Sequence, residues 1–153
     1  MAPGVAGNSI SQVKAALLEQ GAVPKLVAPR IGPVKTAEGD MLQADASLEN
    51  EPGFLFDALV LPDGQAAVEA LARDGHTMEF IKDQYRHCKT ILVLGASKAL
   101  LDKAGVSDKL VSGEGDPGLI IAAPGDASNA IKAFIEAIAL HRHVGRETDP
   151  PRV

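Results

Sequence analysis

Three short apolar runs constrain the fold of this chain more than any other feature. Each has four or five residues, too few for a buried helix, and each is rich in Leu, Ile and Val. Runs of this kind are typical of strands that are covered on both faces, as in parallel sheets. The runs are Ala58–Leu61, which is closed by Pro62, Thr90–Leu94 and Leu119–Ala122.

Stretches with helical periodicity separate and flank these runs. The alternation predicts an α/β fold, with a doubly wound, mostly parallel sheet and helices on both faces. The first predicted helix opens at Ser9, with Gln12 completing a capping box, and it ends at Gly21. The other predicted helices cover 66–72, 77–88, Ser97–Lys103, and a last stretch that is capped by Asp126 or Ser128 and buried through Ile131, Phe134, Ile135 and Ile138.

The N-terminal third is less regular. We expect a short strand over Val23–Ala28, then a hairpin in which Val34–Thr36 and Met41–Gln43 flank the turn at 37–40. A polar loop follows from Asp45 to Gly53. A doubly wound sheet normally begins with a strand that leads into its first helix, yet nothing strand-like precedes Ser9. We therefore expect the first strand of the sheet to be missing from this chain.

Composition narrows the class of protein. With 153 residues, the chain is about the size of one domain, which we expect over 1–146, followed by an extended tail over 147–153. The formal charge of −5 argues against a nucleic-acid partner. The sequence has neither an apolar run long enough for a membrane span nor a signal peptide, so we expect a cytoplasmic protein without a membrane partner. Its single cysteine, Cys88, excludes a disulfide framework.

Charge is distributed unevenly along the chain. Between Thr36 and Ala72 there is no Lys or Arg, and this stretch is acidic throughout. A solvated surface is the favoured interpretation, and an acidic docking or cation-binding face is the alternative. The acidic residues are Glu38, Asp40, Asp45, Glu49, Glu51, Asp57, Asp63 and Glu69.

Two motifs resemble a small-ligand site and a metal site, but the predicted elements around them do not fit either function. Residues 113–118 have the spacing of a dinucleotide-binding G-x-G-x-x-G, but an apolar strand follows them where that motif requires a helix. His141 and His143 are two residues apart on a predicted helix, so they point to different sides and cannot share a metal ion. We therefore expect neither a dinucleotide nor a metal site.

Two residues could serve as a nucleophile. Cys88 lies beside positive charge in Arg86–Lys89, which favours a thiolate, but it closes a predicted helix and is more simply explained as a buried packing residue. Ser97 follows the strand Thr90–Leu94, where α/β enzymes mount a nucleophile, but it stands at a helix N-cap position and is assigned to capping. The other residues of this turn, Gly95 and Ala96, have no reactive side chain.

Several segments resemble the C-terminal domain of large-subunit haem catalases, in the same order and with matching spacing from about Ala2 to Arg146. That domain is itself similar to the flavodoxin-like fold of ThiJ/PfpI proteins and class I glutamine amidotransferases. The segments that carry the resemblance are Leu26–Gly32, Thr36–Asp40, Phe56–Gly64, Tyr85–Lys89 and Ala139–His143.

The resemblance implies a chain without catalysis of its own. Active ThiJ/PfpI relatives carry Cys and then His at the turn where this chain has Gly95 and Ala96, and they have an acidic partner in the opening turn, where Gly4–Ser9 has no carboxylate. Catalases bind haem iron through a tyrosine in an Arg-x-Phe-x-Tyr pattern, which the only tyrosine here, Tyr85, does not match. We therefore expect no catalytic, metal or cofactor site on this chain.

The resemblance also implies partners and a role. The haem, and the disproportionation of hydrogen peroxide in oxidative-stress defence, would belong to the core of the parent enzyme. This domain would stabilise the parent's tetramer, with a chaperone-like activity as a further expectation. In the resembling fold the missing strand is central, so the isolated chain would be destabilised or would borrow a strand by oligomerising.

Two alternatives stay open. The chain could be a free-standing ThiJ/PfpI-like hydrolase or glyoxalase-type enzyme that uses Cys88 or Ser97. That alternative requires one of these side chains to face a cleft with a base within hydrogen-bond reach. The weaker alternative is a flavin or nucleotide binder that uses the turn Gly4–Ser9 at a helix N-terminus.

Overall fold

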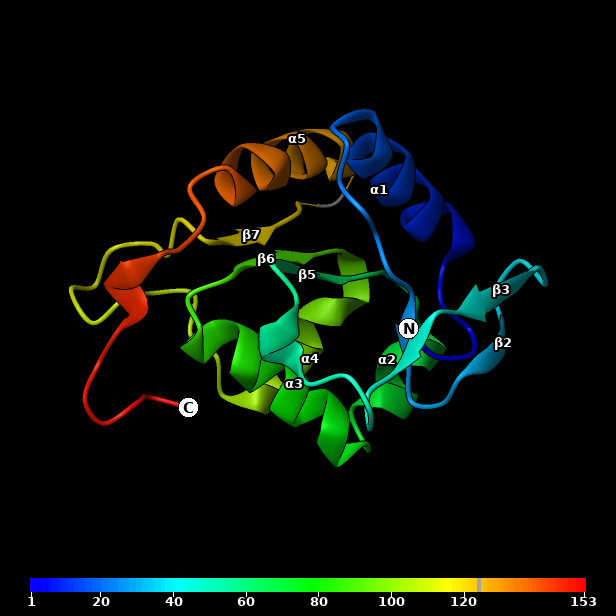
Figure 1. The fold of residues 1–153 in the computed structure, drawn as a ribbon, viewed down its shortest axis with the longest axis horizontal. Helices are drawn as coiled ribbons and strands as arrows, with labels where there is room; N and C mark the ends of the chain where they lie inside the picture. Colours follow the sequence, from blue (N-terminus) through cyan, green and yellow to red (C-terminus); the bar gives the residue numbers. More distant parts are fainter. Residues whose placement is uncertain (124) are drawn as a thin grey trace.

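A three-stranded parallel sheet lies at the centre of the computed structural model, which describes residues 1–123 and 125–153 (Figure 1). The strand order is β5-β6-β7, with Ala58 opposite Thr90 and Ile91 opposite Leu119. The predicted apolar runs are confirmed as strands, each within one residue of its expected limits. The strands are β5 (Ala58–Leu61), β6 (Thr90–Val93) and β7 (Leu119–Ile121).

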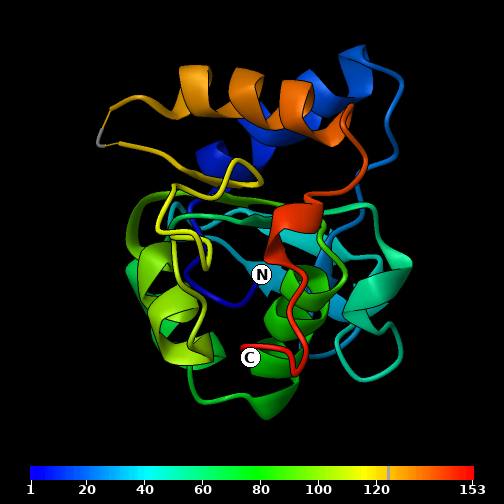
Figure 2. The ribbon, with the colours of Figure 1, turned by 90° about the vertical axis from the view of Figure 1, so that its left-hand side faces the viewer.

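Helices cover both faces of this sheet, which confirms the predicted doubly wound α/β class (Figures 1 and 2). On one face lie α1 (Gly7–Glu19) and α5 (Ala127–Ile138). On the other lie α2 (Gln65–Leu71), α3 (Gly75–Arg86) and α4 (Lys98–Ala104).

The core consists of two apolar clusters, one on each face of the sheet. Because side chains alternate along a strand, Leu92 packs toward Phe134 of α5, while Ile91 packs toward Ile81 of α3 and Leu101 of α4. Burial of each such side chain stabilises the fold by about 1.5–3 kcal/mol. The sheet therefore holds the two helical layers together.

The N-terminal region forms two small sheets. The predicted hairpin is confirmed, with β2 (Gly32–Lys35) and β3 (Met41–Ala44) antiparallel. The strand expected over 23–28 is only β1 (Val27–Ala28), and it pairs in parallel with β4 (Ala46–Ser47), inside the segment predicted to be a polar loop. No sequence pattern predicts this pair, because each strand has only two residues.

Several predicted helix boundaries are wrong. The first helix starts at Gly7 rather than Ser9, and the Gln12 capping box does not form. α5 ends at Ile138, so His141 and His143 lie beyond the helix and not on it. Asp126 stands at the N-cap of α5, but no side chain accepts a capping hydrogen bond there.

Short 3-10 helices occupy Gly53–Leu55 (η1), Gly95–Ser97 (η2) and Val144–Arg146 (η3).

β5 differs from the expected strand buried on both faces. Ala58, Leu59 and Val60 are only partly buried, and within residues 1–123 and 125–153 β5 pairs only with β6. A cavity of about 460 Å³ lies along its other side and is lined also by residues 22–27. No strand precedes α1 in the described residues, where Val5 forms only an isolated bridge to Thr36.

Candidate functional site

The turn after β6, which we call the elbow (Leu94–Ser97), lies beside the turn that follows β5. Gly95 has φ +52°, in the left-handed region that favours glycine. The sharp change from strand to 3-10 helix at this residue has the shape that α/β enzymes use to present a nucleophile. The backbone therefore has the shape of a reactive elbow, but Gly95 provides no reactive side chain.

A carboxylate fills the space where a side chain at residue 95 would lie. A Cβ built on Gly95 would overlap the carboxylate of Asp63, which comes from the turn after β5. Asp63 Oδ1 accepts hydrogen bonds from the backbone N–H of Gly64 at 2.7 Å and of Ala96 at 2.9 Å. A backbone N–H at this position can stabilise an oxyanion in an enzyme, but here a fixed anion already occupies it.

Ser97, the last residue of the elbow, is buried. Its side chain is not a helix cap, which corrects the prediction, because no N–H of α4 donates to it. Its Oγ donates instead to the carbonyl oxygen of Pro62, at the end of β5. Among the hydrogen bonds of the described residues, Ser97 Oγ thus has a carbonyl partner and no general base, so it does not meet the requirement of the hydrolase alternative.

A second carboxylate caps the opening helix. Glu38 Oε2, from the turn of the β2–β3 hairpin, accepts from the Gly7 N–H at 2.9 Å. This hydrogen bond is the largest of the causes that lower the pKa of Glu38. The opening turn Gly4–Ser9 contains no carboxylate of its own, as predicted, and the carboxylate that contacts it comes from the hairpin. An anion at this helix N-terminus also opposes the binding of a flavin or nucleotide phosphate.

Ser9 has a role that the sequence did not reveal. Its Oγ accepts from the Asp63 N–H at 3.1 Å, and the Ala6 N–H donates to the Asp63 carbonyl at 2.9 Å. Through these bonds the N-terminus of α1 is tied to the turn that fills the elbow. No local pattern indicates this link, because the partners lie more than 50 residues apart along the chain.

Cys88 lies at the other edge of the sheet, away from the elbow. It is 1% exposed, has φ +57° and precedes β6. Burial is the largest of the causes that raise the pKa of its thiol. A raised pKa disfavours the thiolate that a nucleophile needs, and the burial of Cys88 confirms its prediction as a packing residue.

A buried polar cluster lies near Cys88, and the sequence analysis did not predict it. Arg146 Nε lies 2.5 Å from Asp116 Oδ2, and both side chains are essentially inaccessible to solvent. Thr90 Oγ1 and His143 Nε2 are 2.9 Å apart, and burial lowers the pKa of His143. These contacts fix the segment after α5 against the amino ends of β6 and β7. They join residues separated by 30 or more positions, which no sequence pattern indicates.

Tyr85 does not fit a haem ligand. The residue is 4% exposed, and the Arg146 guanidinium lies 4.9 Å from the centre of its ring. Burial is the largest of the causes that raise the pKa of its hydroxyl, which opposes the phenolate that iron would need. The expectation that this chain provides no haem site stays a prediction, and nothing in the surroundings of Tyr85 favours such a site.

The acidic stretch is solvent-accessible, as predicted, because none of its eight acidic residues is buried, and some of these side chains also make defined contacts. Glu38 and Asp63 hold backbone N–H groups as described, and Asp45 Oδ2 accepts from the Leu26 N–H at 2.7 Å. Asp57 lies 3.6 Å from Lys89 Nζ. Glu38, Asp45 and Asp63 therefore provide acceptors for backbone N–H groups, whereas the exposed Asp57 makes only a surface ion pair.

Outside Pro124, no group of three or more His, Cys, Asp or Glu side chains is placed to hold a metal ion. None of the helices in the same residues is long and apolar enough to span a membrane.

Comparisons with known proteins give consistent results. The family described as the C-terminal domain found in long catalases matches residues 5–148. Catalase HPII from Pseudomonas putida is 33% identical over 147 residues, which cover 96% of this chain and 19% of that protein. Catalase C from Rhizobium meliloti is also 33% identical, covering 94% of this chain and 19% of that protein.

Solved structures resemble the fold at lower identity. Schizosaccharomyces pombe DJ-1 has a TM-score of 0.75 and 16% identity, with 92% of this chain and 93% of that chain covered. A ThiJ/PfpI family protein from Pseudomonas syringae has a TM-score of 0.74 and 19% identity, with 93% and 66% covered. At these identities the similarity concerns the fold alone.

Proposed function

Because this chain belongs to the family of C-terminal domains found in long catalases, we propose that it is a non-catalytic module that stabilises the assembled enzyme. The chain spans about a fifth of the length of the relatives that it matches. In this proposal the rest of the enzyme carries the haem and converts hydrogen peroxide to water and oxygen in oxidative-stress defence. Its partners are that catalase core and further copies within a cytoplasmic tetramer.

The filled elbow is the observation that carries the proposal. The Asp63 carboxylate occupies the place of a nucleophile and already accepts from the Ala96 N–H, which would otherwise be free to hold an oxyanion. Nucleophilic catalysis needs a nucleophile, a base within reach and donors for the developing charge. The first and third of these are blocked by a single side chain, which favours a structural role over a hydrolase or glyoxalase.

Stabilisation follows from binding linkage. A module that contacts only the folded, assembled core shifts the equilibrium away from the unfolded chain. The fixed C-terminal segment, held by the Asp116–Arg146 pair at 2.5 Å, suits this module to act as one rigid body. Such a module stabilises the enzyme by binding alone and takes no part in the reaction with peroxide.

The test compares a long catalase that carries this domain with the same enzyme from which the domain is deleted. We expect deletion to lower Tm by several degrees while the peroxide turnover per haem at 25 °C stays within about twofold. An unchanged Tm would contradict the stabilising role. A large loss of turnover per haem with full haem content would contradict the non-catalytic role.

A chaperone-like activity is the second candidate, favoured by apolar side chains on the surface. Val23 is 78% exposed and Leu140 is 67% exposed, and other large apolar residues are similarly accessible. Exposed apolar surface can hold unfolded clients. We expect the chain to reduce the light scattering of a heated, unrelated client protein at a stoichiometric ratio, and no reduction would exclude this candidate.

A further inference from the structure

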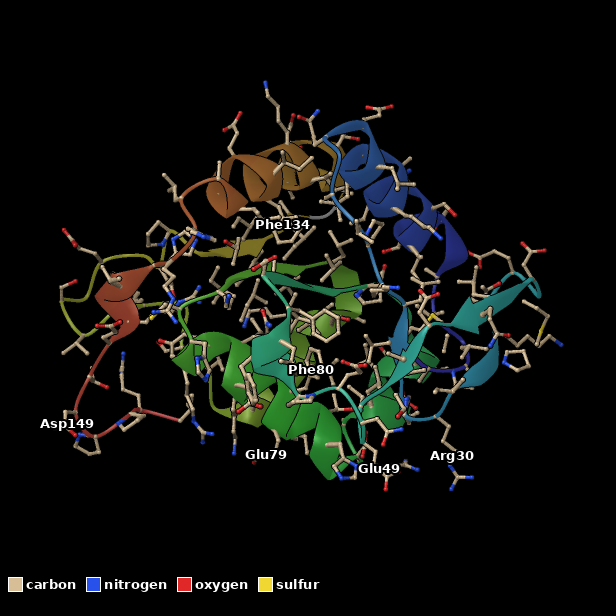
Figure 3. The ribbon with its side chains drawn as sticks, viewed as in Figure 1. Arg30, Glu49, Glu79, Phe80, Phe134 and Asp149 are labelled. Atoms are coloured by element: carbon tan, nitrogen blue, oxygen red, sulfur yellow. The ribbon has the colours of Figure 1, made fainter. Side chains whose placement is uncertain are left out.

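The segment that follows α5 buries polar side chains and no apolar one. We call it the strap (residues 139–147), and in Figure 3 it is the ribbon between α5 and the labelled Asp149. His143 and Arg146 are its buried residues, while its large apolar residues, Leu140 and Val144, are 67% and 61% exposed. A segment that buries so little apolar surface can open locally while the remainder of the molecule stays folded.

Hydrogen bonds attach the strap to the segments that lead into β6 and β7. The His143 N–H donates to the Cys88 carbonyl at 2.8 Å, and His143 Nε2 lies 2.9 Å from Thr90 Oγ1. Arg146 Nε donates to Asp116 Oδ2 at 2.5 Å. The attachment therefore depends on His143 and Arg146, and the first of these titrates near neutral pH.

The strap lies over the Cys88 thiol. This side chain is 1% exposed, and the charges of three strap residues act on its pKa, namely those of Arg142, Arg146 and Glu147. Movement of the strap would therefore expose a thiol that is otherwise inaccessible. Because the chain has one cysteine, the reactivity of that thiol reports the position of the strap.

A pivot connects the strap to α5. The helix ends at Ile138, and His141 has φ +68°, in the left-handed region. A change of backbone angles at a residue just beyond the end of a helix moves the following segment and leaves the helix in place. The strap can therefore swing from His141 while α5 keeps its contacts with the sheet.

Burial and charge both favour a neutral His143 in the closed strap. Burial is the largest of the causes that lower its pKa, the Arg146 guanidinium lowers it further, and the Asp116 carboxylate opposes both. Cys88 and Tyr85 add no charge, because burial raises the pKa of each. The titratable and charged groups on the elements around His143 are Arg146 and Glu147 at η3, Asp116 before β7, Cys88 and Lys89 before β6, and Tyr85 on α3.

Protonation of His143 works against the closed strap. A proton on its imidazole places a second buried cation beside Arg146, whose Nη2 has no hydrogen-bond partner among the described residues. In the open strap, water surrounds His143 and its pKa returns to about 6.5. Because the closed state has the lower pKa, the closing free energy is fully present above about pH 6.5 and is lost as the pH falls below that value.

We propose that the strap is a pH-operated switch, which lies across the amino ends of β6 and β7 at neutral pH and swings away when His143 is protonated, exposing Cys88 while the sheet stays folded. Opening hydrates Asp116 and Arg146 together, so neither charge is left buried without the other. This inference goes beyond the proposed function, because it needs neither a catalase core nor a tetramer. It differs from a general loss of stability in acid, since the strap alone opens.

The reaction of Cys88 with dithiodipyridine tests the proposal on the full chain. The thiolate attacks one sulfur of this disulfide and releases thiopyridone, and the rate is divided by that of glutathione at the same pH to correct for the thiolate fraction. We expect this normalised rate to rise at least about fivefold from about pH 7 to about pH 5. Urea below the unfolding transition should change it little, because local opening exposes little surface. A constant normalised rate, or a steep dependence on urea, would overturn the proposal.

Matched substitutions assign the effect to one histidine. His143→Gln keeps a group that can hydrogen-bond Thr90 Oγ1 but takes up no proton, while His76→Gln makes the same change at a side chain that is 62% exposed. We expect His143→Gln to abolish the acid-induced rise in normalised rate and His76→Gln to leave it intact. The same rise in both variants would overturn the role of His143.

Hydrogen exchange on the unaltered chain gives a second readout that needs no variant to fold. The His143 amide donates to the Cys88 carbonyl in the closed strap, and the Leu92 amide lies within the sheet. After correction for intrinsic exchange rates, we expect acid to reduce the protection of the His143 amide and to leave that of Leu92 unchanged. Equal losses at both amides would indicate unfolding of the whole chain, and full protection of His143 would indicate a fixed strap. Either result would overturn the proposal.

Discussion

The two edges of the parallel sheet hold their carboxylates in different ways. At the carboxyl edge, Asp63 is partly exposed and rests on the backbone N–H groups of Gly64 and Ala96. At the amino edge, Asp116 is fully enclosed and pairs with the Arg146 guanidinium. The first arrangement preserves the shape of a reactive turn without a reactive group, and the second ties a distant segment to the core. Aspartate thus fills the position of a nucleophile at one edge, and at the other it holds a distant segment against the core.

Breaking the buried pair should have the largest effect on stability. Arg146→Ala leaves the Asp116 carboxylate enclosed without a counter-charge, and we expect the free energy of unfolding to fall by about 3–5 kcal/mol in urea titrations. The control is Lys98→Ala, which breaks the exposed Lys98–Asp102 pair and should cost less than about 1 kcal/mol. Similar losses for both variants would show that Asp116 is not enclosed as described.

Placing a nucleophile at the elbow should have the second-largest effect on stability. Gly95→Cys combines a positive φ with an overlap on the Asp63 carboxylate, so we expect a loss of about 2–3 kcal/mol and no esterase or glyoxalase turnover. Adding Asp63→Gly should recover part of the stability, because it removes the overlap, while activity stays absent. Turnover in either variant would contradict the assignment of the elbow as inactive.

Removing the elbow carboxylate alone should have a smaller effect. Asp63→Ala leaves the N–H groups of Gly64 and Ala96 without their acceptor, but both are near enough to solvent to be hydrated. We expect a loss of about 1–2 kcal/mol, measured by thermal and chemical unfolding. A loss as large as that of Arg146→Ala would remove the contrast between the two edges.

The smallest predicted effect concerns pH. The folded-state pKa of His143 is lowered, chiefly by burial, so the unfolded chain binds its proton more readily. Stability from this residue is therefore fully present above its ordinary pKa of about 6.5 and is lost as pH falls below that value. We expect His143→Gln to flatten the decline of Tm between pH 7 and pH 5. Parallel declines in the two proteins would contradict a buried, neutral His143.

The sheet and its helices were predictable because their signal is local. Apolar runs of four or five residues gave β5, β6 and β7, and periodicity gave the helices that cover them. Ser9 and Ser97 were interpreted as caps because serine favours that position. In the fold Ser9 Oγ accepts from Asp63 and Ser97 Oγ donates to the Pro62 carbonyl.

The carboxylates that define the two edges could not be predicted. Asp63, Glu38 and Asp116 act on residues 30 or more positions away, apart from short bonds within their own turns. One sequence without spatial information cannot distinguish such residues from a solvated acidic stretch. What it could predict is the absence of side-chain chemistry at Gly95 and Ala96, since that depends only on residue identity.

The enclosed amino group of Met1 has a practical consequence for anyone handling the protein. Burial lowers the pKa of this amino group to about 6, and any residue fused ahead of Met1 turns the group into an amide and extends the chain at the mouth of an apolar channel. A tagged preparation would thus lose a group that titrates just below neutral pH and would bring vector-encoded residues next to β5. Solubility, melting temperature and self-association measured with a leader peptide attached would then describe a different molecule from the untagged one.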